Sequence, residues 1–132
     1  METGGNNHSR AALVVAHPSH ELRVHGWLQT SRPCVFVLTD GSGRAGEPRL
    51  QSTTKVLADV GAQPGSIYGR ARDVDVYEAF LNQDSSFFIG IAEELAEEFS
   101  RQKIEYVVAD SDEGYSPTHD VCRLLTNAQW KW

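Results

Sequence analysis

The chain has 132 residues, of which 40% are hydrophobic and 23% are charged. This length and composition are typical of one soluble domain with a single core. The formal net charge is −6 at pH 7 and no cluster of basic residues is present, which argues against a protein that binds nucleic acid. No uncharged run is long and apolar enough to span a bilayer, so we expect no membrane partner.

Residues 1–10 contain no apolar stretch of the kind that a signal peptide requires, and we interpret them as a disordered leader. Residues 11–132 are then expected to form a single domain. The two cysteines, Cys34 and Cys122, lie in apolar contexts and form no Cys-x-x-Cys motif. We expect reduced thiols in the core of a cytoplasmic protein, with one buried disulfide as the alternative.

The first half of the chain alternates between apolar runs and helical spacing. The continuous apolar runs are typical of strands that are covered on both faces. Pro33 ends the first helical segment, and Gly61 is placed to cap the second. The predicted elements are strands at 11–16 and 34–39 and helices at 21–30 and 49–61.

The second half begins with a short predicted strand at 65–68 and an ambiguous segment at 73–83, either loop or short helix. The clearest helix covers 86–102, where apolar residues form one stripe. We expect the acidic residues of that helix to face water, and these are Glu93, Glu94, Glu97 and Glu98. A strand at 104–109 and a helical segment from about residue 118 complete the chain.

Strands that alternate with helices indicate a parallel sheet built from strand–helix–strand units. The sequence therefore predicts a Rossmann-like α/β domain, with helices on both faces of the sheet in a three-layer α/β/α arrangement. In such domains the ligand site lies beyond the carboxyl ends of the strands. Polar clusters follow the predicted strands at these ends, and they begin at His17, Asp40 and residue 110.

Histidines are concentrated at this predicted edge. His17 and His20 follow the first strand three residues apart, and His119 follows the last predicted strand. Three imidazoles at one sheet edge are suitable ligands for a zinc ion. Each motif also has an ordinary interpretation, because His-x-x-His occurs in turns and on surfaces and His119 could begin a helix capped by Thr118.

The loop at 40–49 is rich in glycine and is either a flexible connection or a wall of the substrate site. In the second case Arg44 or Arg49 would bind a polar sugar or a phosphate group. Tyr115 could stack on a sugar ring or serve as packing. The glycines of the loop follow the second strand at the wrong spacing for a dinucleotide fingerprint, so we predict no nicotinamide cofactor.

Taken in order, these motifs resemble the N-acetylglucosaminyl-phosphatidylinositol deacetylase family, also called LmbE-like or PIG-L. Its first motif is Ala-His-Pro-Asp-Asp-Glu, and residues 16–21 read Ala-His-Pro-Ser-His-Glu. Its second strand ends in Thr-Asp-Gly, as residues 39–41 do. A helix then carries Arg and, three residues later, Glu, where this chain has Arg49 and Ser52. The last motif is His-Pro-Asp-His, and residues 116–119 read Ser-Pro-Thr-His.

The resemblance implies a role for each matching position. The metal ligands of the family map to His17, His20 and His119, where His20 replaces a carboxylate. The catalytic base of the family maps to Ser19, and its assisting histidine maps to Ser116. All three ligand positions therefore still carry a side chain that can bind a metal, whereas both proton-transfer groups are lost.

Nearby carboxylates could replace the lost base or orient an imidazole ligand. The candidates are Glu21, which is next to His20, Asp40 from the second strand, and Asp120, which is next to His119. The sequence does not choose between these two roles.

The resemblance implies a zinc-dependent hydrolase with one ion per chain, although imidazole ligands also suit other divalent metals. Its substrate would be a small, sugar-like compound with an acyl amide or ester, and the bond cleaved would be a non-peptide carbon–nitrogen bond in the case of an amide. One alternative is a metal- or sugar-binding descendant without catalysis, and another is an α/β domain with incidental histidines and a protein partner. The family continues beyond the point that corresponds to residue 132, so we interpret the chain as shortened, either as a fragment or as a shorter relative. If the chain is complete, we expect Trp130 and Trp132 either to pack back onto the sheet or to form part of a homo-oligomer contact.

Overall fold

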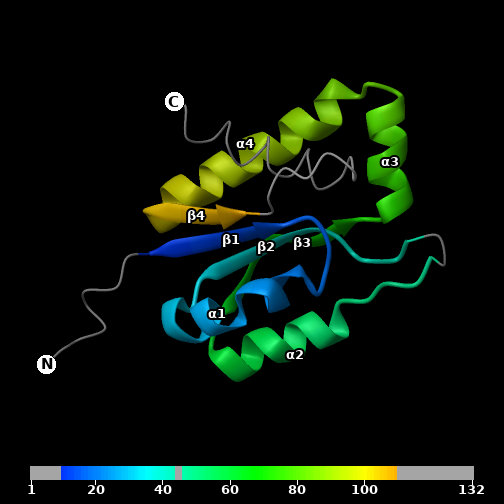
Figure 1. The fold of residues 1–132 in the computed structure, drawn as a ribbon. Coiled ribbons are helices and arrows are strands. Elements are labelled where there is room, and N and C mark those ends of the chain that lie inside the picture. Colours follow the sequence, from blue (N-terminus) through cyan, green and yellow to red (C-terminus); the bar gives the residue numbers. More distant parts are fainter. Residues whose placement is uncertain (1–9, 44–45, 110–132) are drawn as a thin grey trace, which may run out of the picture.

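The computed structural model describes residues 10–43 and 46–109. Within these residues four strands form one parallel sheet in the order β3-β2-β1-β4, with helices on both faces (Figure 1). This arrangement confirms the predicted three-layer α/β fold. The strands are β1 (Ala11–Val15), β2 (Cys34–Thr39), β3 (Gln63–Ala71) and β4 (Tyr106–Ala109).

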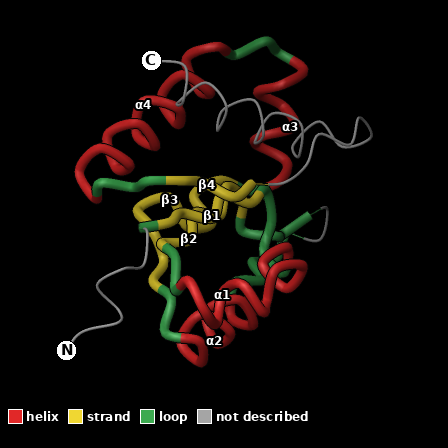
Figure 2. The backbone as a smooth tube through the Cα atoms, turned by 60° about the vertical axis from the view of Figure 1, so that its left-hand side comes forward, coloured by secondary structure: helices red, strands yellow, loops and turns green. Residues whose placement is uncertain are grey.

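Helices close the sheet from two sides, as Figure 2 shows. One face carries the 3₁₀ helix η2 (His20–Val24) with α1 (His25–Ser31) and α2 (Gln51–Val60). The other face carries α3 (Asp73–Leu81) and α4 (Ser85–Gln102). No helix in the described ranges is long and apolar enough to cross a membrane.

The central strand β1 serves both cores because alternate side chains of a strand point to opposite faces. Ala12 and Val14 pack in the cluster beneath α3 and α4. Leu13 and Val15 pack in the cluster beneath α1 and α2. All of β1 is buried, as the uninterrupted apolar run predicts.

The helix predicted at 21–30 is present but divided. Its first turn is the 3₁₀ helix η2, and regular α-helix begins at His25. Val24 separates the two with φ −126° and ψ 31°, which are not helical angles. The unit ends where Arg32 adopts a left-handed conformation directly before Pro33.

The third strand is longer than predicted, since β3 extends from Gln63 to Ala71 rather than over 65–68. Its pairing with β2 shifts register twice, which removes the simple alternation that a sequence pattern would display. The ambiguous segment that follows is the helix α3. Gly65 permits a close approach, because a Cβ atom there would lie 2.5 Å from the ring of Phe36.

Helix α4 confirms the predicted helix at 86–102 and begins one residue earlier, with the Asp84 side chain accepting a hydrogen bond from the Phe87 amide. The expectation that all four glutamates face water is wrong for two of them. Glu94 is half-buried and pairs with Arg70 of β3, and Glu98 is half-buried and pairs with Arg101. Glu94 meets a strand residue because α4 lies over β3, whereas Arg101, the partner of Glu98, is on α4 itself.

Candidate functional site

The chain reverses its direction across the sheet at β1. It proceeds from β1 to β2 and β3 on one side and then returns to place β4 on the other side. A topological switch point of this kind leaves a crevice between the carboxyl ends of the two strands where the direction changes, here β1 and β4. Val14 of β1 is paired with Ala109 of β4, so both strands end at the same edge of the sheet, and His17 follows β1 there.

His17 is held at this edge by groups from two other strand ends. Its Nδ1 atom lies 2.8 Å from Oγ1 of Thr39, the last residue of β2. The same atom lies 3.1 Å from Oδ1 of Asp73, which begins α3 directly after β3. Because the side chains of His17 and Asp73 are only 24% and 20% exposed, this contact is largely shielded from solvent.

Asp73 is itself fixed at both carboxylate oxygens. Oδ2 accepts a hydrogen bond of 2.6 Å from the Gly43 amide in the loop after β2. A carboxylate in the first turn of a helix is also stabilised by the helix dipole. Residues that follow β1, β2 and β3 therefore meet around a single imidazole ring.

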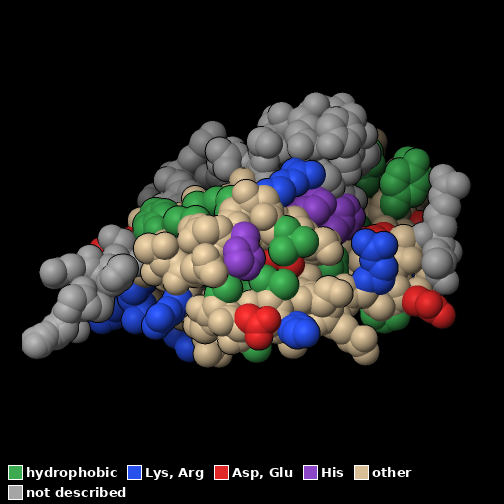
Figure 3. All heavy atoms as spheres, turned by 60° about the horizontal axis from the view of Figure 1, so that its bottom comes forward, with side chains coloured by type: hydrophobic (Ala, Val, Ile, Leu, Met, Phe, Trp, Pro, Cys, Tyr) green, Lys and Arg blue, Asp and Glu red, His purple; other side chains and the backbone are tan. Residues whose placement is uncertain are grey.

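His20 lies beside His17, with the two ring centroids 5.3 Å apart in an edge-to-face arrangement. It borders a hollow of about 190 Å³ between η2 and β4, lined by Leu13, Val15, His20, Arg23, Val24, Val108 and Ala109. Histidine side chains reach the molecular surface in Figure 3. The sequence prediction that His17 and His20 lie together at a sheet edge is thus confirmed.

The two described carboxylates that the sequence suggested as bases are both buried. Glu21 is 1% exposed, and one of its oxygens accepts a hydrogen bond from the Thr53 hydroxyl of α2. Asp40 is 8% exposed, and its Oδ1 accepts from the Ser42 amide. Both carboxylates hold local structure in this arrangement, since the bond to Glu21 connects η2 to α2 and the bond to Asp40 closes a turn.

The loops after β1 and β2 are packed tightly against each other. Gly41 has a φ of +72°, and a Cβ atom there would lie 3.0 Å from the ring of Pro18. The neighbouring Ser42 is buried, and its hydroxyl has no hydrogen-bond partner within the described residues.

Arg49 is exposed at the same edge, where its amide donates to the Asp40 carbonyl at 2.7 Å. It borders an open hollow of about 350 Å³, lined by Ser19, Pro48, Arg49, Gln51 and Ser52. Among the described residues Arg49 forms no ion pair with a carboxylate. This position suits contact with a polar or anionic group of a ligand.

Several predicted site residues lie outside the described residues, and these are Arg44, Tyr115, Ser116, His119 and Asp120. The third predicted metal ligand is therefore not placed. In residues 10–43 and 46–109 no group of three His, Cys, Asp or Glu side chains is arranged to hold a metal ion. His17 and His20 supply two donors at most.

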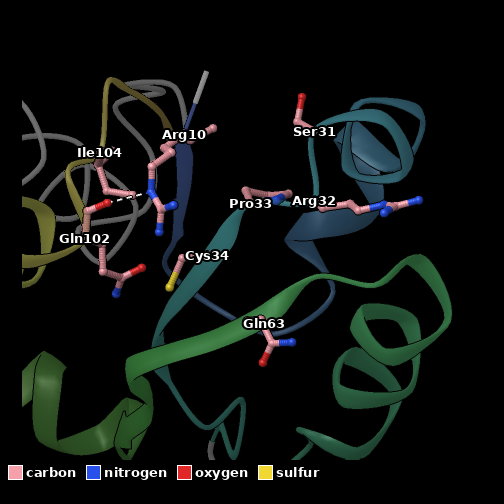
Figure 4. A pocket seen from close by; sticks show the side chains of 9 residues that line it. Arg10, Ser31, Arg32, Pro33, Cys34, Gln63, Gln102 and Ile104 are labelled. Carbon is pink, nitrogen blue, oxygen red and sulfur yellow. Dashed lines mark hydrogen bonds between the residues drawn. The ribbon is translucent and has the colours of Figure 1, made fainter. Parts of the chain in front are cut away.

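A further pocket lies at the opposite, amino-terminal edge of the sheet (Figure 4). It has a volume of about 260 Å³, and the Arg10 guanidinium that enters it donates to the Gln102 carbonyl at 2.7 Å. Arg32 extends away from Cys34 in this view. Burial raises the pKa of the Cys34 thiol, so the thiolate that nucleophilic chemistry requires is disfavoured there.

Comparison of the chain with protein-family models finds no match, and comparisons with curated proteins and with solved structures find none either. The resemblance to the deacetylase family therefore rests on the quoted motifs alone.

Sequence reasoning did not identify Asp73 and Thr39 as part of the site. Both residues follow the rule that polar groups at strand ends converge, because Thr39 ends β2 and Asp73 comes two residues after Ala71, the last residue of β3. Because the third strand was predicted to end at residue 68, Asp73 was not expected to lie at a strand end.

Proposed function

We propose that the protein is a metal-dependent hydrolase that binds one zinc ion through His17, His20 and His119. The substrate class is a small, sugar-like compound with an acyl amide or ester. The observation that supports this proposal is the placement of two adjacent imidazoles at the switch point of the parallel sheet. Ligands of such folds bind in the crevice at this location.

The described side chains fit a metal at this position in two respects. Thr39 and Asp73 both contact the Nδ1 atom of His17, so Nε2 is the atom that would bind a metal. A metal-binding histidine commonly donates its other ring N–H to a carboxylate in this way. The His20 ring lies next to the His17 ring, so the two could share one ion. An imidazole-bound zinc ion supplies Lewis acidity and lowers the pKa of water toward about 7.

Other residues at this edge would bind and orient the substrate. Arg49 offers a guanidinium to a hydroxyl-rich or anionic group beside the hollow that it borders. Ser19 lies in the same hollow, at the position that corresponds to the base of the family. Its hydroxyl is a poor base at neutral pH, so we expect slow turnover and a preference for esters, whose leaving groups need less protonation than amines do.

One observation favours a second candidate, the binding protein without catalysis. Glu21 and Asp40 are buried and accept hydrogen bonds from the Thr53 hydroxyl and the Ser42 amide. In this arrangement neither carboxylate is placed to accept a proton from water. A domain with metal ligands and no base would bind a metal or a sugar and release it unchanged.

Hydrolysis by the zinc-loaded protein separates the two candidates. The substrates are p-nitrophenyl acetate and N-acetylglucosamine, and His20→Ala is compared with His25→Ala, which removes an exposed imidazole of α1. The hydrolase proposal predicts zinc-dependent turnover that is lost in His20→Ala and kept in His25→Ala.

Ser19→Asp adds a direct test of the missing base. Ser19 is exposed and has a φ of 82°, a left-handed conformation that Asp adopts more readily than most residues. We expect ester hydrolysis to rise by about 10²-fold or more, the usual contribution of a positioned base. Zinc binding with no turnover in either the wild type or Ser19→Asp would favour the binding protein.

A further inference from the structure

We infer that Asp73 is a positioning residue that fixes the tautomer and the orientation of the His17 ring. No motif of the sequence assigns this residue a role. The part of the inference that concerns metal affinity rests on the proposed function, whereas the part that concerns the tautomer does not.

The tautomer follows from the chemistry of the contact. An ionised carboxylate can only accept hydrogen bonds, so the Asp73 Oδ1 atom at 3.1 Å requires a hydrogen on His17 Nδ1. The Thr39 hydroxyl at 2.8 Å is compatible with this assignment, because it can accept from the same N–H. A neutral His17 ring then carries its lone pair on Nε2, which is the atom that a metal requires.

Asp73 is suited to this task because its carboxylate cannot rotate freely. The Gly43 amide holds the second oxygen at 2.6 Å, so the first oxygen remains directed at the His17 ring. Arg72, the preceding residue, pairs instead with Asp75, and the Asp73 carboxylate forms no ion pair with an arginine of the described residues. The negative charge of Asp73 therefore acts on the imidazole.

The same geometry predicts that Asp73→Asn reverses the tautomer. An asparagine side chain has one oxygen, and the Gly43 amide needs an acceptor. When the oxygen faces Gly43, the amide nitrogen faces His17 and donates a hydrogen bond to Nδ1. This arrangement places the hydrogen on Nε2 and blocks the atom that would bind a metal.

The test is long-range ¹H–¹⁵N correlation NMR of the metal-free, full-length protein with labelled histidines. Spectra are recorded at increasing pH until the His17 signals no longer change, so that the neutral ring is observed. The His17 signals are assigned by their loss in His17→Gln. We expect hydrogen on Nδ1 in the wild type and on Nε2 in Asp73→Asn.

Asp75→Asn is the matched control, since it removes the same charge from the first turn of the same helix. The inference predicts that its His17 ring keeps the wild-type tautomer. Hydrogen on Nε2 in the wild type, or the same tautomer in the wild type and in a folded Asp73→Asn, would overturn the inference. Circular dichroism confirms that each variant is folded.

A zinc titration against a competing chelator measures the consequence for the metal. Loss of the carboxylate behind a ligating histidine typically weakens metal affinity by about 10–100-fold, so we expect this loss in Asp73→Asn and none in Asp75→Asn. A wild type that binds no zinc but has the predicted tautomer would contradict the proposed function and leave the positioning role intact. A wild type that binds zinc, with unchanged affinity and tautomer in Asp73→Asn, would contradict the positioning role alone.

Discussion

Gly41 allows the loops after β1 and β2 to approach more closely than a residue with a side chain would allow. Its positive φ is a conformation that costs other L-residues about 1–2 kcal/mol, and Pro18 fills the space that a Cβ atom would occupy. The loop that carries His17 is thereby packed against the loop that carries Asp40 and Gly43.

We predict that Gly41→Ala lowers the free energy of unfolding by about 2 kcal/mol or more, since the backbone cost and the contact with Pro18 add. Gly46→Ala is the matched control, because Gly46 has a φ of +80° with open space around it. Urea denaturation should give the larger loss for Gly41→Ala. Equal losses would show that the contact with Pro18 contributes nothing.

At this scale the sequence predicted some site residues and missed others for a physical reason. His17 and His20 were predictable together because they share one short turn after an obvious strand. Asp73 was not, because its contact with His17 joins residues 56 apart in the sequence and depends on where β3 ends. Because the pairing of β3 with β2 shifts register, the sequence of β3 does not show the two-residue alternation from which the end of a strand is predicted.

An ion pair between Arg70 and Glu94 connects β3 to α4. The two terminal nitrogens of the Arg70 guanidinium, Nη1 and Nη2, donate to the two carboxylate oxygens of Glu94, at 2.8 and 2.7 Å. The hydrogen bonds from Arg70 are the main reason that the pKa of Glu94 is lowered. Helix periodicity predicted α4 itself but could not predict this pair, because the partner is on a strand.

Glu94→Gln should lower the free energy of unfolding at pH 7 by no more than about 1 kcal/mol, because the Arg70 side chain is 45% exposed and water screens the pair. A lowered pKa in the folded state means that the stabilisation is present above the ordinary carboxyl pKa of about 4.3. It is lost as the pH falls through the folded value. The difference between wild type and variant should therefore shrink in acid.

The control for this pair is Glu93→Gln, one residue away on the same helix. Glu93 is exposed and forms no ion pair with any residue in the described ranges. Chemical denaturation at pH 7 should show a change of only a few tenths of a kcal/mol. A loss as large as that of Glu94→Gln would mean that the helix charge, rather than the pair, is responsible.

The whole molecule depends on two separate apolar cores, one on each face of the sheet. The parallel sheet and the layer arrangement were predictable from the sequence because continuous apolar strands alternate with amphipathic helices, whereas the strand order β3-β2-β1-β4 was not predicted. Leu95 of α4 is 2% exposed in one core, whereas Ile89 of the same helix is 54% exposed. The pair therefore compares a core position with a surface position on one helix.

Leu95→Ala should lower the free energy of unfolding by about 2–5 kcal/mol, the usual cost of a large-to-small change in a core. Ile89→Ala should change it by no more than about 0.5 kcal/mol, as surface substitutions do. Thermal or urea unfolding of both variants measures the difference. A similar small effect at both positions would contradict the packing of α4 against the sheet.

The switch point between β1 and β4 is the feature of the whole molecule from which a function can be argued. Its carboxyl edge brings together two imidazoles, a fixed carboxylate and an exposed arginine, and these are His17, His20, Asp73 and Arg49. The opposite edge offers a protonated thiol and an arginine bound to a backbone carbonyl. The chemistry of a metal-dependent hydrolase is therefore proposed for the first edge only.

The zinc content of the protein, measured by mass spectrometry after zinc is supplied and excess is removed, shows whether the proposed metal site exists. The proposal predicts about one zinc ion per chain in the wild type and in His25→Ala, and loss of the ion in His17→Ala. A wild type without zinc, or a His17→Ala variant that retains the ion, would contradict a metal site at the carboxyl edge of β1.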